Sequence, residues 1–303
     1  MDSISPRYAE ALRRRETMNL SEGGDTDAYR LVDGLGDALP GIELETFGDA
    51  WLVSTRDAFV PRDMAAWLQA SGRPIYHKRL DQHQKESPVH LAGAQVNAPF
   101  LIKENGLAYE ISFQAGYSQG IFLDQRCNRL ALRQRLGRGK SLLNTFAYTG
   151  AFSVAAASVG AVTTTLDLSQ PYLDWAKRNL EHNGLDPASH HFCKGDTFHW
   201  LARFAKQGRQ FDAIVLDPPT FSRDKDGKVF RVERDYGRLA SLAAQCLSPH
   251  GVLLASTNCR QLTDATFLRT LREAIPRGRH FSSVPMPPDF TGEAYLKSVW
   301  VEM

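Results

Sequence analysis

Three acidic residues each follow an apolar run in the second half of the chain. Asp167 ends the run AVTTTLD, Asp196 follows HHFCKG, and Asp217 follows FDAIVL. Short apolar runs bounded by turn residues are typical of buried strands. Ligands of an open parallel sheet bind beyond the carboxyl ends of its strands. We therefore expect the three carboxylates to face a common ligand.

Each acid has an expected role and a structural alternative. Asp167 is placed to accept hydrogen bonds from ribose hydroxyls, or to cap the helix that follows. Asp196 is placed to accept a hydrogen bond from an adenine amino group, and it can also cap the next helix. Asp217 precedes Pro218 and Pro219, which form a rigid loop without free N–H groups. We favour a functional role over a structural turn for Asp217, because this loop would hold its carboxylate still.

The loop NTFAYTG, residues 144–150, follows the first strand of this part of the chain. It has one glycine in its tight part, whereas a dinucleotide fingerprint has three, so it fits a pyrophosphate poorly. Backbone N–H groups at the start of the next helix can still bind a carboxylate or a ribose-linked group.

Alternating strands and helices are expected to position these residues. The patterns predict strands over residues 141–148, 161–168, 190–196, 211–218 and 251–258. They predict helices over residues 151–160, 171–184, 197–207, 234–247 and 264–275. Such alternation is typical of right-handed crossovers and a parallel sheet covered on both faces, an α/β fold. The last two strands, 280–287 and 295–303, have no helix between them and predict an antiparallel hairpin.

The first part of the chain has a different pattern. Short β-like runs broken by Gly, Pro and Asp extend from residue 28 to about residue 116, with one helix over residues 63–70. We expect three regions: an N-terminal helix and linker (1–27), a small α+β hairpin domain (28–118) and a ligand-binding domain (119–303). Their 303 residues are enough to bury a full core.

The composition of the chain excludes several classes of protein. The chain has 36 Lys and Arg against 34 Asp and Glu, which excludes nucleic-acid binding through global charge alone but not through a local basic face. Its four cysteines form no CxxC pair, so we expect no metal site, and they suit a reducing compartment. There is no signal peptide and no apolar stretch long enough to cross a membrane. We expect a soluble, cytoplasmic protein.

The motifs NTFAYTG, LDLSQ, KGD and LDPPTFSR, in this order, resemble those of class I S-adenosylmethionine-dependent methyltransferases. Together with GIFLDQRCNR and the terminal PPDF and YLKSVW, they resemble the bacterial 23S ribosomal RNA methyltransferases that act on cytosine C5 or guanine N7. The similarity covers roughly residues 28 to 303. It implies a Rossmann-like, mostly parallel seven-stranded sheet, S-adenosyl-L-methionine as cofactor, ribosomal RNA as substrate and a homodimer. About 25 residues precede the match, so we expect the RNA-binding domain common in such enzymes to be missing.

The resemblance also implies roles for single residues. The FLDQR segment would close over the methionine end of the cofactor, Asp167 would hold the ribose, Asp196 the adenine, and Asp217 would lie beside the sulfonium and the target base. The implied cofactor-binding residues are Asp124, Gln125, Arg126, Phe146, Tyr148, Thr149, Gly150, Asp167, Leu168, Ser169, Asp196, Thr197, Asp217 and Pro218.

The methylated atom depends on the segment STNCR, residues 256–260. Methylation of cytosine C5 requires a cysteine thiolate that adds to the ring, and Cys259 is near the place of that cysteine. An ungapped comparison instead puts Asn258 there, as in the guanine-N7 enzymes. Guanine N7 has a free lone pair and needs positioning, not a nucleophile. We favour N7, with Asp217 and Asn258 as the catalytic residues and Cys259 as an inert alternative.

Local basic segments are the remaining indication of the substrate. Six cations without an intervening acid are Arg126, Arg129, Arg133, Arg135, Arg138 and Lys140. A smaller group, 77–79, lies in the hairpin domain, and 223–238 is interpreted as a solvated lid or loop. These segments are either an RNA-binding face or ordinary solvated surface. A methyltransferase for a small molecule or a protein, and a cofactor-binding protein without catalysis, remain as alternatives.

Overall fold

The computed structural model describes residues 6–81, 86–223 and 229–303. Contacts divide the chain into two compact units. The first unit comprises Met1–Arg126 together with Pro287–Ala294, and the second comprises Cys127–Met286 together with Tyr295–Met303. The domain boundaries expected from the sequence, at residues 27/28 and 118/119, stay a prediction.

The first unit contains a five-stranded sheet with two helices. Its strands, in sheet order, are β1 (Ala28–Asp33), β2 (Ile42–Phe47), β3 (Ala50–Thr55), β4 (Ile75–Arg79) and β5 (Val89–Ala92). Its helices are α1 (Pro6–Thr17) and α2 (Arg62–Ala70), with 3-10 turns η1 (Glu22–Gly24), η2 (Gly34–Asp37) and η3 (Leu123–Gln125). The chain crosses through α2 between β3 and β4, which pair in parallel, whereas the other strand pairs are antiparallel. The expected small α+β unit is present.

Two further strands of this unit, β6 (Phe100–Glu104) and β7 (Leu107–Ile111), form a separate antiparallel hairpin. They lie in the run PFLIKENGLAYEISF, residues 99–113, which is one of the short β-like runs expected between residues 28 and 116. Strand β5 is not one of the expected runs, because it has only four residues and all of them are exposed or half-buried.

The second unit is built on a seven-stranded sheet in the order β10-β9-β8-β11-β14-β16-β15. The strands are β8 (Ser141–Thr145), β9 (Val162–Asp167), β10 (His191–Lys194), β11 (Phe211–Leu216), β14 (Leu247–Thr257), β15 (His280–Val284) and β16 (Lys297–Glu302). The first five run parallel, and β16 is antiparallel to both β14 and β15. The predicted mostly parallel sheet and its antiparallel last hairpin are confirmed.

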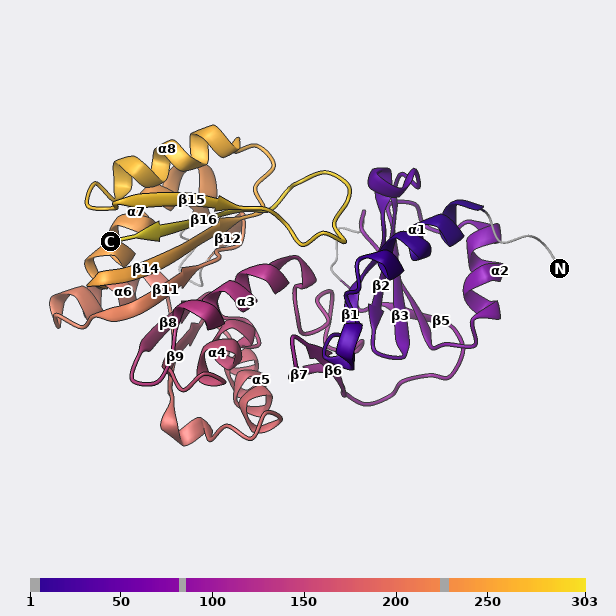
Figure 1. Ribbon diagram of the computed structural model, residues 1–303, viewed down its shortest axis with the longest axis horizontal. Helices are drawn as coiled ribbons and strands as arrows, with labels where there is room; N and C mark the ends of the chain where they lie inside the picture. Colours follow the sequence, from indigo (N-terminus) through magenta and orange to yellow (C-terminus); the bar gives the residue numbers. More distant parts are fainter. Residues whose placement is uncertain (1–5, 82–85, 224–228) are drawn as a thin grey trace. The chain divides into compact units, whose positions relative to one another are not determined.

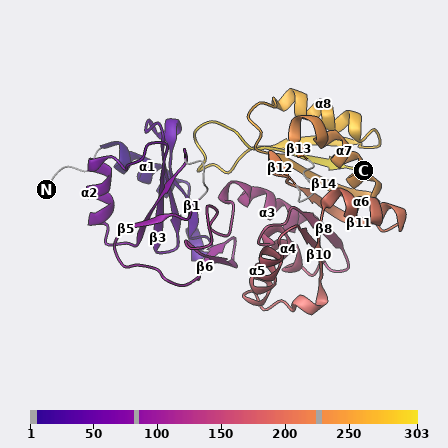
Figure 2. The same cartoon turned by 180° about the vertical axis from the view of Figure 1, so that it is seen from behind.

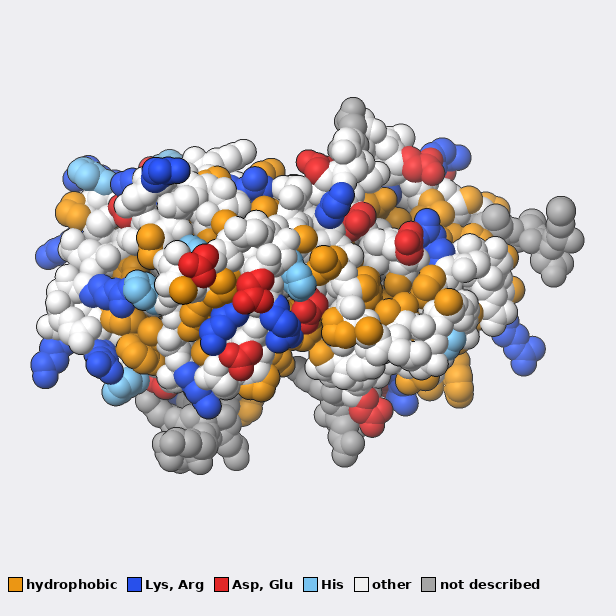
Figure 3. Space-filling model, turned by 90° about the horizontal axis from the view of Figure 1, so that it is seen from below, with side chains coloured by type: hydrophobic (Ala, Val, Ile, Leu, Met, Phe, Trp, Pro, Cys, Tyr) orange, Lys and Arg blue, Asp and Glu red, His pale blue; other side chains and the backbone are white. Residues whose placement is uncertain are grey.

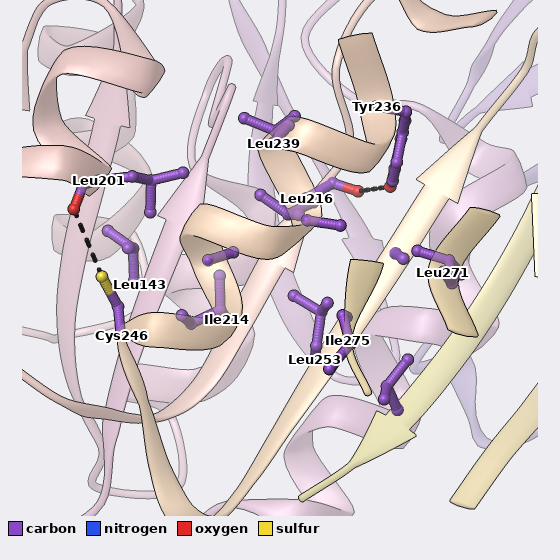
Figure 4. Close-up of a cluster of buried hydrophobic side chains, with 14 of the residues drawn as sticks. Leu143, Leu201, Ile214, Leu216, Tyr236, Leu239, Cys246, Leu253, Leu271 and Ile275 are labelled. Atoms are coloured by element: carbon purple, nitrogen blue, oxygen red, sulfur yellow. Dashed lines mark hydrogen bonds between the residues drawn. The ribbon is translucent and has the colours of Figure 1, made fainter. Parts of the chain in front are cut away.

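Helices cover both faces of this sheet (Figure 1 and Figure 2). They are α3 (Arg126–Arg135), α4 (Ala151–Ala157), α5 (Gln170–Glu181), α6 (Thr197–Lys206), α7 (Val232–Gln245) and α8 (Asp264–Ala274), with a 3-10 turn η4 (Pro187–Ser189). Successive strand residues face opposite sides, so Leu142 packs with α3 and α4 whereas Leu143 packs with α6, α7 and α8. Figure 4 shows part of this second cluster, in which Ile214 on β11 lies between Leu143 on β8 and Leu253 on β14. Burial on both faces explains why these strands read as continuous apolar runs.

The interpretation of residues 223–238 as a solvated lid or loop is wrong for the residues from 229 onward. There β13 (Val229–Arg231) pairs with β12 (Phe221–Arg223), and α7 begins at Val232, two residues before the helix predicted over residues 234–247. The many charged residues of this segment alternate with apolar residues at helical spacing, of which Val232 and Tyr236 are buried. Residues 224–228 lie outside the described residues. Within the described part of the chain, no helix is long and apolar enough to cross a membrane.

Candidate active site

The loop between β8 and α4 is held in an unusual backbone conformation. Phe146 (φ 50°) and Tyr148 (φ 49°) both adopt left-handed backbone angles that are uncommon for residues with a Cβ atom. Gly150 (φ 75°) leaves no room for a side chain, because a Cβ there would lie 2.6 Å from the Cβ of Ala176. Such strain persists only when the surroundings impose it, and it is frequent at binding sites.

Buried polar residues behind the loop provide that support. The Nδ2 of Asn179 on α5 donates to the carbonyl of Thr149 at 2.9 Å, and the Nδ2 of Asn144 donates to the Oγ of Ser153 at 3.0 Å. The sequence analysis did not single out these supporting side chains. The available signal was a polar residue on the apolar stripe of a helix: Asn179 is fully buried on the same helix face as Leu180 and Ala176.

Asp167, at the end of β9, connects this loop to the next helix. Its Oδ2 accepts from the N–H of Tyr148 at 2.9 Å, and its Oδ1 accepts from the N–H of Ser169 at 2.8 Å. Burial raises the pKa of the carboxyl, and hydrogen bonds from these backbone N–H groups oppose the shift. A carboxylate offers about four lone-pair sites, so two backbone bonds leave capacity for hydroxyl donors. Ser169 itself is the N-cap residue of α5, and Leu168 between them is exposed.

Asp196 lies on the neighbouring strand end, after β10. Its Oδ1 accepts from the N–H of His199 at 2.9 Å, so the helix-capping role is present. Gly195 precedes it with a φ of 146°, and a Cβ there would come within 2.8 Å of the Nε1 of Trp200. The N–H of Gly195 donates to the carbonyl of Asp167, which links the ends of β9 and β10. Thr197 is buried in the first turn of α6.

The two predicted catalytic residues follow two neighbouring strands. Asp217 comes after β11 and Asn258 after β14, and these strands pair with Leu216 opposite Ala255. The Oδ1 of Asn258 accepts from the Oγ1 of Thr220 at 2.7 Å, which joins the Asp-Pro-Pro loop to the end of β14. Asp217 is half-buried, Pro218 is buried, and Asn258 is exposed. Sequence reasoning did not assign a role to Thr220.

Tyr236 on α7 contacts the ends of the same two strands, β11 and β14. Its hydroxyl lies 3.1 Å from the carbonyl oxygen of Leu216 and 3.0 Å from that of Ser256, and the two carbonyls share its single hydrogen. Figure 4 shows the bond to Leu216. Burial and the nearby charge of Asp217 raise the pKa of this hydroxyl, which therefore stays protonated as a donor.

Cys259 is enclosed next to Asn258. The residue is 1% exposed, and its Sγ donates to the Oε1 of Glu233 at 3.4 Å. Burial raises the pKa of the thiol, and the hydrogen bond to the Glu233 carboxylate raises it further. Thiolates used as nucleophiles have lowered pKa values and accessible sulfur atoms. The surroundings of Cys259 instead bury the sulfur atom and raise the pKa of the thiol.

Asp124, Gln125 and Arg126 belong to the first unit, whereas the other predicted site residues belong to the second. Asp124 and Gln125 form the 3-10 turn η3, in which Gln125 is buried. The guanidinium of Arg126 forms a buried ion pair with Asp289.

The basic segments are used within the fold only in part. Arg126 and Arg129 are 5% and 2% exposed. Arg135, Arg138 and Lys140 are exposed, and Lys140 pairs with Asp212 at 3.0 Å. In the first unit Lys78 donates to Gln119, and burial lowers the pKa of its ammonium group. Figure 3 shows one face of the molecule on which Lys and Arg side chains stand among Asp and Glu side chains. Within the described residues, no group of three or more His, Cys, Asp and Glu could hold a metal ion.

The chain is similar to several known proteins. Residues 58–299 match a family described as S-adenosylmethionine-dependent methyltransferases. The chain is 36% identical over 249 residues to a Bacillus subtilis protein named "Putative ribosomal RNA large subunit methyltransferase YwbD", covering 79% of this chain and 63% of that protein. It is 35% identical over 272 residues to ribosomal RNA large subunit methyltransferase I of Klebsiella pneumoniae, covering 86% of this chain and 68% of that one. The chain thus spans about two thirds of the length of these relatives.

A similar solved structure is that of SMU.776 complexed with SAH. It has a TM-score of 0.87 and 30% sequence identity, and the match covers 100% of this chain and 83% of that chain.

Proposed function

Because the chain belongs to the family of S-adenosylmethionine-dependent methyltransferases, we propose that it methylates a base of large-subunit ribosomal RNA. The names of the two relatives support this class of substrate. We propose guanine N7 as the methylated atom, in preference to cytosine C5.

The residues of the second unit fit the cofactor. S-adenosylmethionine supplies a methyl group activated by the attached sulfonium. The spare lone pairs of Asp167 suit the two ribose hydroxyls, since both carboxylate oxygens are already oriented by backbone donors. The Oδ2 of Asp196 is available to an adenine amino group, because the helix-capping bond within the described residues uses Oδ1. The loop that ends at Gly150, where a Cβ would meet Ala176, would contact the methionyl part through its backbone.

The observation that carries the N7 proposal is the state of Cys259. A C5 mechanism requires a thiolate that reaches the ring, whereas this sulfur is buried and its pKa is raised. At N7 the ring lone pair forms the new bond to the methyl carbon as the carbon–sulfur bond breaks, and no proton is lost. The side chains then have to orient the ring and stabilise the positive charge that it acquires. Asn258, oriented by Thr220, can donate to the guanine keto oxygen, and the Asp217 carboxylate can stabilise the charge.

The test is transfer of radiolabelled methyl groups to ribosomal RNA, followed by nucleoside mapping. We expect 7-methylguanosine. The Cys259→Ala variant should keep transfer within a few-fold of the wild type and form no covalent RNA adduct, whereas Asn258→Ala should lose roughly 10- to 100-fold, the effect of removing a positioning hydrogen bond worth about 1.5–3 kcal/mol.

Three results would contradict the proposal. Label in 5-methylcytidine, with transfer abolished by Cys259→Ala, would establish the C5 reaction. Label in a small-molecule extract or in protein, with none in RNA, would establish a different substrate class. Bound cofactor without transfer to any of the three would support a non-catalytic role.

A further inference from the structure

A buried aromatic ring in the second unit contacts two of the loops that the cofactor is proposed to bind. Phe230 on β13 is 9% exposed. Its ring centroid lies 6.4 Å from that of Phe146 and 6.0 Å from that of Phe198. Both separations are within the range of interacting aromatic pairs. Phe230 thus connects the loop after β8, which contains Phe146, with the first turn of α6, which follows Asp196.

The contact matters for Phe146 because its backbone is held in a costly conformation. Phe146 has a φ of 50°, an angle that persists for a residue with a Cβ atom only where the surroundings impose it. Hydrogen bonds hold the next two residues: the N–H of Ala147 donates to the carbonyl of Leu166, and the N–H of Tyr148 donates to the carboxylate of the proposed ribose contact. Phe146 itself is half-buried, and its ring packs against the buried cluster to which Phe230 belongs. Packing against Phe230 is therefore one of the contacts that hold Phe146 in place.

The second ring, that of Phe198, lies next to the proposed adenine contact. Asp196 caps α6 and Thr197 begins it, so Phe198 is two residues from the capping carboxylate. Phe198 is half-buried, and the guanidinium of Arg238 lies 5.0 Å from the centroid of its ring. Because a hydrogen-bonded helix moves as one element, the packing of Phe198 against Phe230 also helps to fix the Asp196 carboxylate at the end of that helix.

The position of Phe230 is set by the pairing of β12 with β13. Ser222 on β12 lies opposite Phe230, and the N–H of Val232 donates to the carbonyl of Thr220 at 3.1 Å. Strand β12 directly follows the Asp-Pro-Pro-Thr loop that begins at Asp217. One ring therefore connects the segments that follow β8, β10 and β11.

We propose that Phe230 is a positioning residue for S-adenosylmethionine, which acts through Phe146 and Phe198 without contacting the cofactor. This proposal rests on the proposed function, because it takes the segments after β8 and β10 to bind the methionyl part and the adenine. It gives a role to β13, which the sequence analysis interpreted as part of a solvated lid or loop. A purely structural role for Phe230 would instead predict a loss of stability alone.

The experiment measures S-adenosylmethionine binding to the full chain by titration calorimetry and thermal unfolding by circular dichroism. Phe230→Leu keeps an apolar side chain but removes the ring. We expect its Kd to rise about 10-fold, the order of magnitude for the loss of two aromatic contacts. The KM for S-adenosylmethionine should rise by a similar factor while kcat changes little, because the ring does not touch the reacting atoms. Phe198→Leu, at a half-buried position, removes one of the two contacts at a smaller cost to folding and should raise Kd by about 3-fold.

A matched control is Phe211→Leu. Phe211 is 2% exposed, belongs to the same buried cluster and contacts the ring of Phe204 at 5.5 Å. It is the first residue of β11, so it lies at the edge of the sheet opposite to the carboxyl ends of the parallel strands. This variant should lower the unfolding temperature at least as much as Phe230→Leu but leave Kd unchanged.

A double-mutant cycle separates positioning from direct contact. Phe146 is itself a proposed cofactor contact, so Phe146→Leu should weaken binding by its own effect. If Phe230 acts through Phe146, Phe230→Leu should weaken binding by a smaller factor in the Phe146→Leu background than in the wild type. Phe211→Leu combined with Phe146→Leu should show no such coupling.

Three outcomes would overturn the proposal: a wild-type Kd in Phe230→Leu; an equal loss of affinity in Phe211→Leu; or independent effects of Phe146→Leu and Phe230→Leu whose factors multiply. Since binding is measured without RNA, the result is independent of the RNA assay. A wild type that binds S-adenosylmethionine but labels no RNA contradicts only the proposed function.

Discussion

At the scale of the residue, Asp167 combines two tasks in one carboxylate. It holds the strained β8–α4 loop through the N–H of Tyr148, and it keeps acceptor capacity for the ligand. Partial burial makes the ionised form costly, which is why the pKa of this carboxyl is raised. The same burial strengthens each hydrogen bond that the ionised form accepts.

This residue predicts a pH dependence. As the pH falls through the raised pKa of Asp167, the carboxyl gains a proton and loses acceptor capacity, so S-adenosylmethionine binding should weaken at a higher pH than an exposed aspartate would cause. Calorimetric titrations from pH 8 to pH 4 measure this. Asp167→Asn should raise Kd by about 10- to 100-fold at neutral pH, from charged hydrogen bonds worth about 1.5–3 kcal/mol. If the variant showed the same acid sensitivity as the wild type, another group would be responsible.

At the scale of the element, adjacent strand ends place the two proposed catalytic residues at one edge of the sheet. Parallel pairing of β11 with β14 puts Asp217 and Asn258 at one edge of the sheet, and α7 closes that edge from one face. The buried hydroxyl of Tyr236 lies within hydrogen-bond distance of the carbonyls of Leu216 and Ser256, one on each of these strands.

Tyr236→Phe should therefore destabilise the second unit and slow transfer together. Leaving buried carbonyl groups without this donor costs about 1–3 kcal/mol of folding free energy. The change also removes a hydrogen bond that helps to fix the spacing of Asp217 and Asn258. Urea denaturation and initial transfer rates measure the two effects. Tyr29→Phe is the control, since the Tyr29 hydroxyl makes no hydrogen bond within the described residues. Equal stability and equal transfer rates in the two variants would contradict a bridging role for Tyr236.

At the scale of the whole molecule, the first unit depends on contacts between the beginning and the end of the chain. Arg15 donates to both oxygens of Asp37 and to the carbonyl of Asp289, 274 residues away. Both side chains of the Arg15–Asp37 pair are 1% exposed. The pair lowers the pKa of Asp37, although burial alone would raise it.

Asp37→Ala should leave the Arg15 charge buried without its partner, at a cost of about 3–5 kcal/mol. Chemical denaturation followed by circular dichroism measures the loss. Asp81→Ala, which removes the exposed partner of Arg79, should change the midpoint little, because surface ion pairs are screened by water. A small effect at Asp37 would mean that water or a rearranged acid neutralises Arg15.

The sequence indicated most of the second unit because parallel strands are buried on both faces, so each one appears as an apolar run. Asp167, Asp196 and Asp217 lie at or just after the ends of β9, β10 and β11, where that pattern predicts them. Asn258, which the resemblance indicates, follows β14, and the roles of all four residues stay predictions. The antiparallel β15–β16 pair was found because no helix separates the two runs. Strand β5 and the β12–β13 hairpin were missed, since short strands in polar surroundings carry no such pattern.

Only the tertiary structure decided which residues that lie far apart in the chain are in contact. The sequence presents Arg126 as one of six cations on a basic segment, and the structure pairs it with Asp289, 163 residues away. It presents Cys259 as a nucleophile or an inert thiol, and the structure encloses it beside Glu233. Local patterns report whether a residue is buried and in which element; the charge state and partner of a side chain depend on which distant groups the fold brings within a few ångströms of it.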